Sequence, residues 1–128
     1  MNTHVIDRQL TKNALAFLGV ANMGAANTVT FSVRPGTFVL RVFTQTITAF
    51  DSGTTATATI SDGTTTFVNA VDIKTTGAET SAGAPKYYPT GGTITVTLAE
   101  TGTAATVGEL AAGFEYLIRG NGDGGLEE

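Results

Sequence analysis

A period of two governs this sequence from Thr28 onward. In TVTFSVR (28–34) and again in TITVTLAE (93–100), an apolar residue alternates with a hydroxyl-bearing or charged one. Successive side chains of a β-strand point to opposite faces, so this alternation predicts strands with one buried face. The apolar positions that we expect on the buried side are Val29, Phe31, Val33, Ile94, Val96, Leu98, Phe114, Tyr116 and Ile118.

Turn residues divide the alternating segments at short intervals. Pro35-Gly36, Asp51-Ser52-Gly53, Ser61-Asp62-Gly63 and Gly91-Gly92 all have the composition of tight turns. Alternation is irregular from Phe67 to Ile73, which predicts a bulge or a short helical turn around 69–72. The expected strands are 28–34, 37–50, 54–60, 64–74, 86–88, 93–100 and 112–119, with a loop over 75–83. This spacing predicts an all-β, single-domain antiparallel β-sandwich or jelly roll of about seven or eight strands.

The two ends of the chain differ from this central region. Residues 1–27 are only weakly periodic, and we interpret them as an N-terminal arm with a helical turn near 9–18. Residues 28–120 are then the sandwich domain, and the glycine-rich, acidic residues 121–128 a flexible tail. An arm of this kind can bury apolar side chains on a neighbouring protein; the candidates are Val5, Ile6, Leu10, Leu15, Phe17 and Leu18.

Charge and composition exclude several classes of function. Only 14% of the residues are charged and the net charge is −4, whereas nucleic-acid binding needs clustered Lys and Arg. There is no cysteine, no convincing signal peptide and no apolar run long enough for a membrane helix. We therefore expect a protein made in a cytoplasm, with neither nucleic acid nor membrane as a partner.

Threonine makes up about a fifth of the chain. Its β-branched side chain suits a strand, and its hydroxyl keeps an outward face wettable without charge. Burying such a surface against another protein costs little free energy, since few charges must be desolvated. Few lysines guard the sheet edges, so we expect a partner to cover them.

The side chains that carry chemistry are sparse and scattered. His4 is the only histidine, and the carboxylates show no spacing that pairs two of them for catalysis. Residues 121–124 lack the ligand spacing of a calcium loop, and no glycine-rich stretch fits a phosphate cradle. We expect no enzyme, no metal site, no cofactor and no small-molecule substrate. Tyr87 and Tyr88 are either an exposed recognition patch or one core and one edge residue.

The arrangement of turns resembles small structural proteins of tailed bacteriophages. The resemblance lies in residues 37–42 and the turn TAFDSGTTAT (48–57), followed by the hairpin DGTT (62–65). It continues in TGGTITVTLAETGTAATVGE (90–109) and the closing strand FEYLIRG (114–120). In general sequence pattern and in the placement of turns, residues 28–120 are similar to capsid decoration proteins, also called cement or head-stabilising proteins.

That resemblance implies a virion protein on the outside of the capsid. Its partner would be the major capsid protein, whose subunits it would bridge, and the protein would assemble as a dimer or trimer. No active site is implied. Similar domains occur in phage tails and fibres, so a module that binds a host glycan or protein through Tyr87 and Tyr88 is the alternative.

Overall fold

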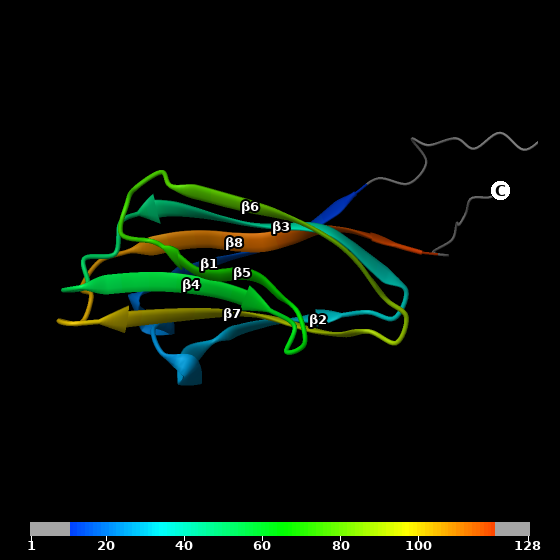
Figure 1. The fold of residues 1–128 in the computed structure, drawn as a ribbon, viewed down its shortest axis with the longest axis horizontal. Helices are drawn as coiled ribbons and strands as arrows, with labels where there is room; N and C mark the ends of the chain where they lie inside the picture. Colours follow the sequence, from blue (N-terminus) through cyan, green and yellow to red (C-terminus); the bar gives the residue numbers. More distant parts are fainter. Residues whose placement is uncertain (1–10, 120–128) are drawn as a thin grey trace, which may run out of the picture.

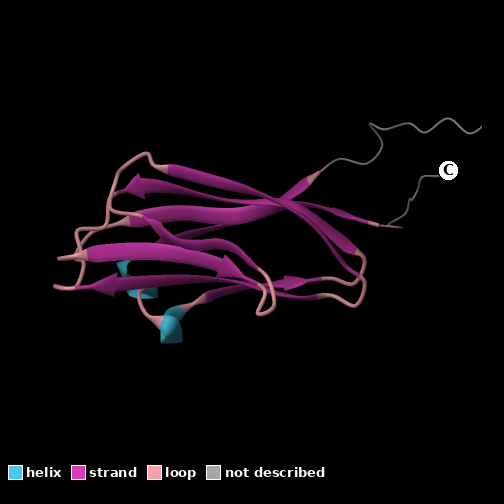
Figure 2. Cartoon of the chain, viewed as in Figure 1, coloured by secondary structure: helices cyan, strands magenta, loops and turns pink. Residues whose placement is uncertain are grey.

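The computed structural model describes residues 11–119, with the side chain of residue 84 excepted, as two stacked four-stranded antiparallel sheets (Figures 1 and 2). One sheet has the order β1-β8-β3-β6 and the other β2-β7-β4-β5. The strands are β1 (Lys12–Gly19), β2 (Val29–Val33), β3 (Thr37–Thr48), β4 (Thr55–Ser61), β5 (Thr66–Asp72), β6 (Glu79–Tyr88), β7 (Gly92–Thr101) and β8 (Glu109–Ile118). Two short 3-10 segments, η2 (Val20–Asn22) and η3 (Ala25–Asn27), connect β1 to β2.

The order of the strands is that of a jelly roll. β1 pairs with β8, β2 with β7, β3 with β6 and β4 with β5, all antiparallel, so the first half of the chain is wound against the second. The predicted all-β sandwich is therefore confirmed. The nested pairing also places segments far apart in the sequence side by side, and the first and last strands share one sheet.

The core lies between the two sheets and follows the predicted phase. Val33, Ile94, Val96, Leu98 and Phe114 are buried. Val29, Phe31, Tyr116 and Ile118 are half-buried near the edges and the end of the sandwich. All nine side chains have their predicted inward orientation, and each except Val33, which lies opposite Gly92, faces another inward residue in the strand register.

The largest correction concerns the N-terminal segment. Residues 12–19 form the edge strand β1 of the first sheet, hydrogen-bonded to β8, so the predicted helical turn is wrong there. Residues 12–19 are thus part of the sandwich, and the expectation that residues 1–27 form an arm leaving it is wrong for β1. Leu18 is only 1% exposed in the core, because the inward face of β1 completes the sheet. Residues 1–10 lie outside the described part, as do residues 120–128.

A second correction concerns the predicted loop at 75–83. Residues 79–83 belong to β6, which pairs along β3 from Glu79 to Tyr88. Two irregularities adjust the strand phase. A register shift near Leu40 turns both Val39 and Val42 inward. Opposite Thr59, β5 shifts register at Ala70, whose φ is 50°. Of the two predicted alternatives, this is the bulge and not the helical turn.

Candidate interaction surface

The outer face of the β1-β8-β3-β6 sheet carries large apolar side chains in cross-strand rows. Phe17 lies beside Ala111 of β8, and the next row runs from Leu15 through Gly113 to Phe43. Phe17 is 61% exposed and Leu15 50% exposed, although an outward strand position ordinarily carries a polar residue in a monomer. We call this surface, defined by Leu15, Phe17, Phe43, Ile47, Ala111 and Gly113, the apolar face.

The apolar face continues beyond the strands at one end. A shallow depression of about 430 Å³ lies beside Phe17 and is also lined by Val107 of the β7–β8 loop and by Glu109 at the start of β8. Val107 is 52% exposed, so the apolar surface extends from β1 onto this loop.

The outer face of the other sheet is chemically different. Threonine and serine occupy most of its outward positions, and pairs of threonines face each other across neighbouring strands. The hydroxyls of Thr55 and Thr101 lie 2.6 Å apart, and those of Thr30 and Thr95 lie 3.4 Å apart. These hydroxyls bind one another or water, so this threonine face is stable in solvent. The two sides of the sandwich are therefore unequal.

Charged side chains lie at the margins of the apolar face. Arg41 and Glu115 occupy the row beyond Leu15, and the exposed Glu79 and Glu109 lie on β6 and at the start of β8. Arg41 Nε donates to Glu115 Oε1 at 3.3 Å, and its Nη1 donates to Ser81 Oγ at 2.8 Å. The Arg41 guanidinium also lies 5.3 Å from the centre of the Phe43 ring. The ion pair is solvent-accessible and adds little stability, but the two charges compensate each other at this margin of the face.

An aromatic and basic cluster lies at the opposite end of the same sheet face. Phe38 of β3 sits between Tyr87 of β6 and Leu117 of β8. Arg119 stacks on Tyr87, 5.7 Å from the ring centre, and its Nη1 lies 3.3 Å from the Tyr87 hydroxyl. Tyr87 is 39% exposed, which fits an exposed recognition residue.

Tyr88 does not share this exposure. It is 6% exposed, and its hydroxyl donates to Asp62 Oδ2 at 2.7 Å. Its predicted role as an interaction residue is therefore wrong, as is that of Leu18. Of the remaining candidates, Leu15, Phe17 and Tyr87 are exposed, whereas Val5, Ile6 and Leu10 lie outside the described residues.

Asp62 holds the β4–β5 hairpin against β6 and so joins the two sheets. It accepts from the backbone N–H groups of Thr64 and Thr65, from the Tyr88 hydroxyl and from the Lys86 ammonium. Burial alone would raise the pKa of Asp62, but Lys86 and the other donors outweigh it and lower that pKa well below its usual range. Burial and the Asp62 hydrogen bond raise the pKa of Tyr88. These donors hold the Asp62 carboxylate between the hairpin and β6, and this structural role accounts for its lowered pKa.

Asp51 has a similar role between two loops. Its carboxylate accepts from the Thr106 hydroxyl at 2.7 Å and from the N–H groups of Thr106 and Val107 at 2.6 and 3.1 Å. The Thr106 hydroxyl and these backbone donors lower the pKa of Asp51 to about 2. Within residues 11–119, no three His, Cys, Asp or Glu side chains gather closely enough to hold a metal ion.

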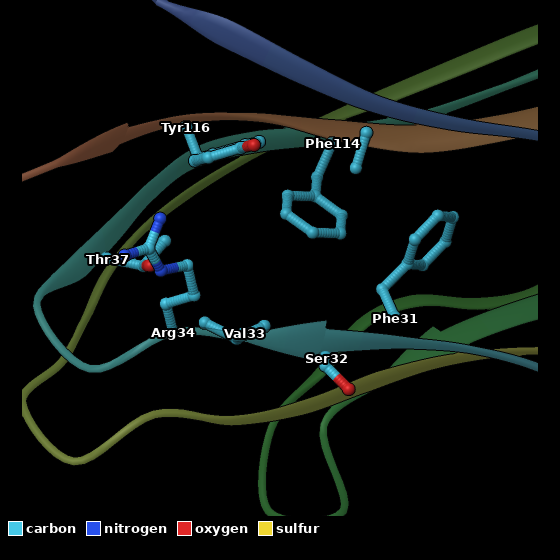
Figure 3. Close-up of a pocket in the computed structure, with 8 residues that line it drawn as sticks. Phe31, Ser32, Val33, Arg34, Thr37, Phe114 and Tyr116 are labelled. Atoms are coloured by element: carbon cyan, nitrogen blue, oxygen red, sulfur yellow. The ribbon is translucent and has the colours of Figure 1, made fainter.

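A small pocket of about 110 Å³ opens between the sheets beside Phe31 and Phe114 (Figure 3). Arg34 reaches from the end of β2 toward Tyr116 across the mouth of this pocket. The walls are otherwise aromatic and aliphatic apart from Thr37, and the Ser32 side chain points away from the pocket. No carboxylate, histidine or thiol lines it, so its residues offer no acid–base pair.

Together these features define the class of the domain: a jelly roll with one threonine face and one apolar face. No protein-family model matches the sequence. No curated protein matches it either. No helix in the described part of the chain has the length and apolar character that crossing a membrane requires.

A solved structure shares the fold. It is a chain of the capsid asymmetric unit of the cyanophage Pam1, with a TM-score of 0.64 and 18% sequence identity. The alignment covers 86% of this chain and 86% of that chain, so the two have about the same length. At this identity the likeness establishes the common fold.

Proposed function

We propose that this protein is a non-enzymatic structural protein of a tailed-phage virion that decorates the outside of the capsid. In this role it bridges subunits of the major capsid protein and stabilises the shell as a homo-oligomer, a dimer or a trimer. The observation that carries the proposal is the shared jelly roll of nearly equal length in a phage capsid asymmetric unit. It is made in the host cytoplasm and acts at the capsid surface.

The surface chemistry supports a role in protein contacts. A decoration protein must present one side to other proteins and another to solvent, and the two sheet faces differ in that way. None of the six residues that define the apolar face is charged, so burying them is favourable and desolvates no charge. The threonine face is suited to remain in water.

The internal polar network favours a structural role over a catalytic one. Asp62 and Asp51, the two carboxylates with lowered pKa values, are both occupied by donors that tie loops and sheets together. We therefore propose no enzymatic activity and no metal, cofactor, nucleic-acid, membrane or small-molecule partner.

Heat stability of particles tests the proposal. Virions that lack this protein should release their nucleic acid at a lower temperature than complete virions, and adding the purified protein back should restore the difference. Equal heat stability with and without the protein would overturn the stabilising role. Deleting residues 1–20 would be a poor substitute, because it removes β1 and part of the core.

The cluster of Phe38, Tyr87 and Arg119 favours a second candidate function. Exposed aromatic rings beside a cation are suited to stacking on sugars or peptide side chains. A tail or head-fibre module would use this cluster to bind a host-surface glycan or protein. Host adsorption that falls with Tyr87→Ala but not with Thr30→Ala, while capsid heat stability stays normal, would favour this alternative over decoration.

A further inference from the structure

We infer that the pocket between the two sheets beside Phe31 and Phe114 is the binding site of the chain's own C-terminal segment, residues 120–128. In this arrangement the side chain of Leu126 fills the pocket, and the carboxylates of Glu127 and Glu128 lie against cations at its mouth. The inference concerns the single chain, so it does not depend on the role of the protein in a virion.

The first argument is the size and lining of the pocket. Its volume is about 110 Å³, and the rings of Phe31, Phe114 and Tyr116 form its walls together with Ala14 and Val33. A dry apolar cavity of about 150 Å³ holds one benzene molecule, which has six carbon atoms. The pocket therefore has room for the four carbon atoms of a leucine side chain, and burying that side chain there removes apolar surface from water.

The second argument is the pair of cations at the mouth of the pocket. Arg34 reaches across the mouth toward Tyr116 (Figure 3). Lys12 lies opposite Tyr116 in the strand register and two residues before Ala14, so its side chain leaves β1 on the same, inward side as that wall of the pocket. Both cations are exposed, and within residues 11–119 neither forms an ion pair. The site is therefore suited to an apolar side chain that has carboxylates next to it in the chain.

The third argument is the separation of charge along the sandwich. Among the described residues, the end at which β1 and β3 begin carries one carboxylate, Asp62, and four basic residues: Lys12, Arg34, Lys86 and Arg119. The opposite end carries, within the same part of the chain, one basic residue, Lys74, and five acidic ones: Asp51, Asp72, Glu79, Glu100 and Glu109. The Arg41–Glu115 pair lies between the two ends. An acidic segment is therefore attracted to the end that holds the pocket and repelled by the other.

The fourth argument is the composition of the C-terminal segment. Its sequence is GNGDGGLEE, which contains three carboxylates and no basic residue. Leu126 is its one large apolar residue, and it directly precedes Glu127 and Glu128. The segment thus has the apolar side chain and the adjacent carboxylates that the pocket and its mouth require.

The fifth argument is proximity, and it favours this segment over another acidic partner. Arg119 donates its backbone N–H to the carbonyl oxygen of Gly36 at 2.7 Å, at the turn that follows Arg34. Thr37 lines the pocket and pairs with the last residue of β8, so β8 ends about 5 Å from a residue of the pocket wall. The seven residues from 119 to 126 can span up to about 25 Å. A segment attached there has an effective concentration on the order of millimolar at the pocket, which a separate protein of equal affinity would have to exceed.

Nuclear magnetic resonance of the full chain in solution tests the inference. The methyl protons of Leu126 should be shifted upfield by the ring currents of Phe31 and Phe114, and they should show nuclear Overhauser contacts to both rings. Leu126→Ser should change the amide signals of residues that line the pocket and leave those of the threonine face unchanged. Arg34→Glu should reduce the upfield shift of the Leu126 methyl protons by about half or more, because an attraction at the mouth becomes a repulsion.

Arg41→Glu is the matched control, because it makes the same change of charge at an exposed arginine on the outer face of β3. It should leave the Leu126 methyl signals unchanged. A charge-reversed chain supplies the rescue: Lys12→Glu and Arg34→Glu together should abolish the upfield shift, and adding Glu127→Lys and Glu128→Lys should restore it.

Three results would overturn the inference. The first is a Leu126 methyl signal at its random-coil position, and the second is a shift that Arg34→Glu and Arg41→Glu change alike. The third is a shift that disappears on dilution, because the pocket would then hold the segment of another copy. None of these results bears on the proposed function, which the heat stability of particles tests separately.

Discussion

Replacing Phe114 by alanine should cost this fold about 3–5 kcal/mol of unfolding free energy, the range for buried aromatic residues. The ring is 3% exposed and lies edge-on to Phe31 at 5.3 Å between ring centres, with Tyr116 at 5.6 Å on its other side. Such aromatic pairs contribute about 0.5–1.5 kcal/mol beyond their buried area. The 110 Å³ pocket already borders this ring, so the new cavity would merge with it. We therefore expect a cost in the upper half of that range.

Phe31→Ala is the comparison that makes this prediction specific. Phe31 is only half-buried, so its truncation should cost roughly half as much, about 2 kcal/mol. Urea unfolding followed by tyrosine fluorescence measures both, with Thr30→Ser as a surface control that should stay within about 0.5 kcal/mol. The melting temperature of Phe114→Ala should fall by roughly 15 °C. A Phe114→Ala cost no larger than that of Phe31→Ala would refute the placement of Phe114 at the centre of the core.

Three further predictions concern the polar ties and the close approach of β1. Asp62→Asn should lose about 1–3 kcal/mol at neutral pH, because Lys86 is left beside a neutral group, and thermal melts compared with the wild type measure this loss. The pKa of Asp51 is lowered to about 2. The stability that its ionised form contributes is therefore present above about pH 4 and is lost as the pH falls toward 2. Thermal melts of Asp51→Asn over this pH range should show a flatter pH dependence than those of the wild type. Gly113→Ala should detach or displace β1, since a Cβ at that position would lie 1.9 Å from the carbonyl oxygen of Ala14. The β1 amides should then exchange hydrogen faster than in the wild type. Unchanged exchange would contradict the close packing of β1 on β8.

The sequence predicted well those elements in which apolar residues alternate strictly. In β7, Ile94, Val96 and Leu98 alternate with threonines, and their inward orientation follows from the period of two alone. The β4–β5 hairpin is equally predictable from the sequence, because Asp62 supplies the side-chain acceptor and Gly63 the positive φ that its turn uses.

β1 escaped prediction because its pattern is inverted. Its large side chains, Leu15 and Phe17, point outward, whereas the small Ala14 and Ala16 point into the core. A hydrophobicity pattern treats the large residues as the buried ones, so the sequence alone gives no strand phase for this segment. β6 was missed for another reason: Ser81, Ala82 and Gly83 have little strand preference, and pairing with the long strand β3 imposes their conformation.

The candidate surface could be predicted only in part. Leu15 and Phe17 were identified as contact residues, but not as members of a sheet face. Their neighbours Ala111 and Phe43 are brought to them by the order β1-β8-β3, which no local pattern contains. Alternation likewise required Tyr87 and Tyr88 to point in opposite directions, but which of them is buried depends on the partner Asp62 from another hairpin.

Selective thiol labelling in assembled particles tests most directly the claim that the apolar face contacts protein and the threonine face contacts water. The chain contains no cysteine, so one introduced thiol reports on one position. Gln45→Cys places it on β3 in the row of Phe17 and Ala111, and Thr30→Cys places it on the opposite face; both positions are exposed in the single chain. We predict that in purified virions the thiol at 45 is protected from a water-soluble maleimide while the thiol at 30 reacts, and that both react in the dissociated monomer. Equal labelling of the two positions in virions, or protection at 30 alone, would contradict the claim.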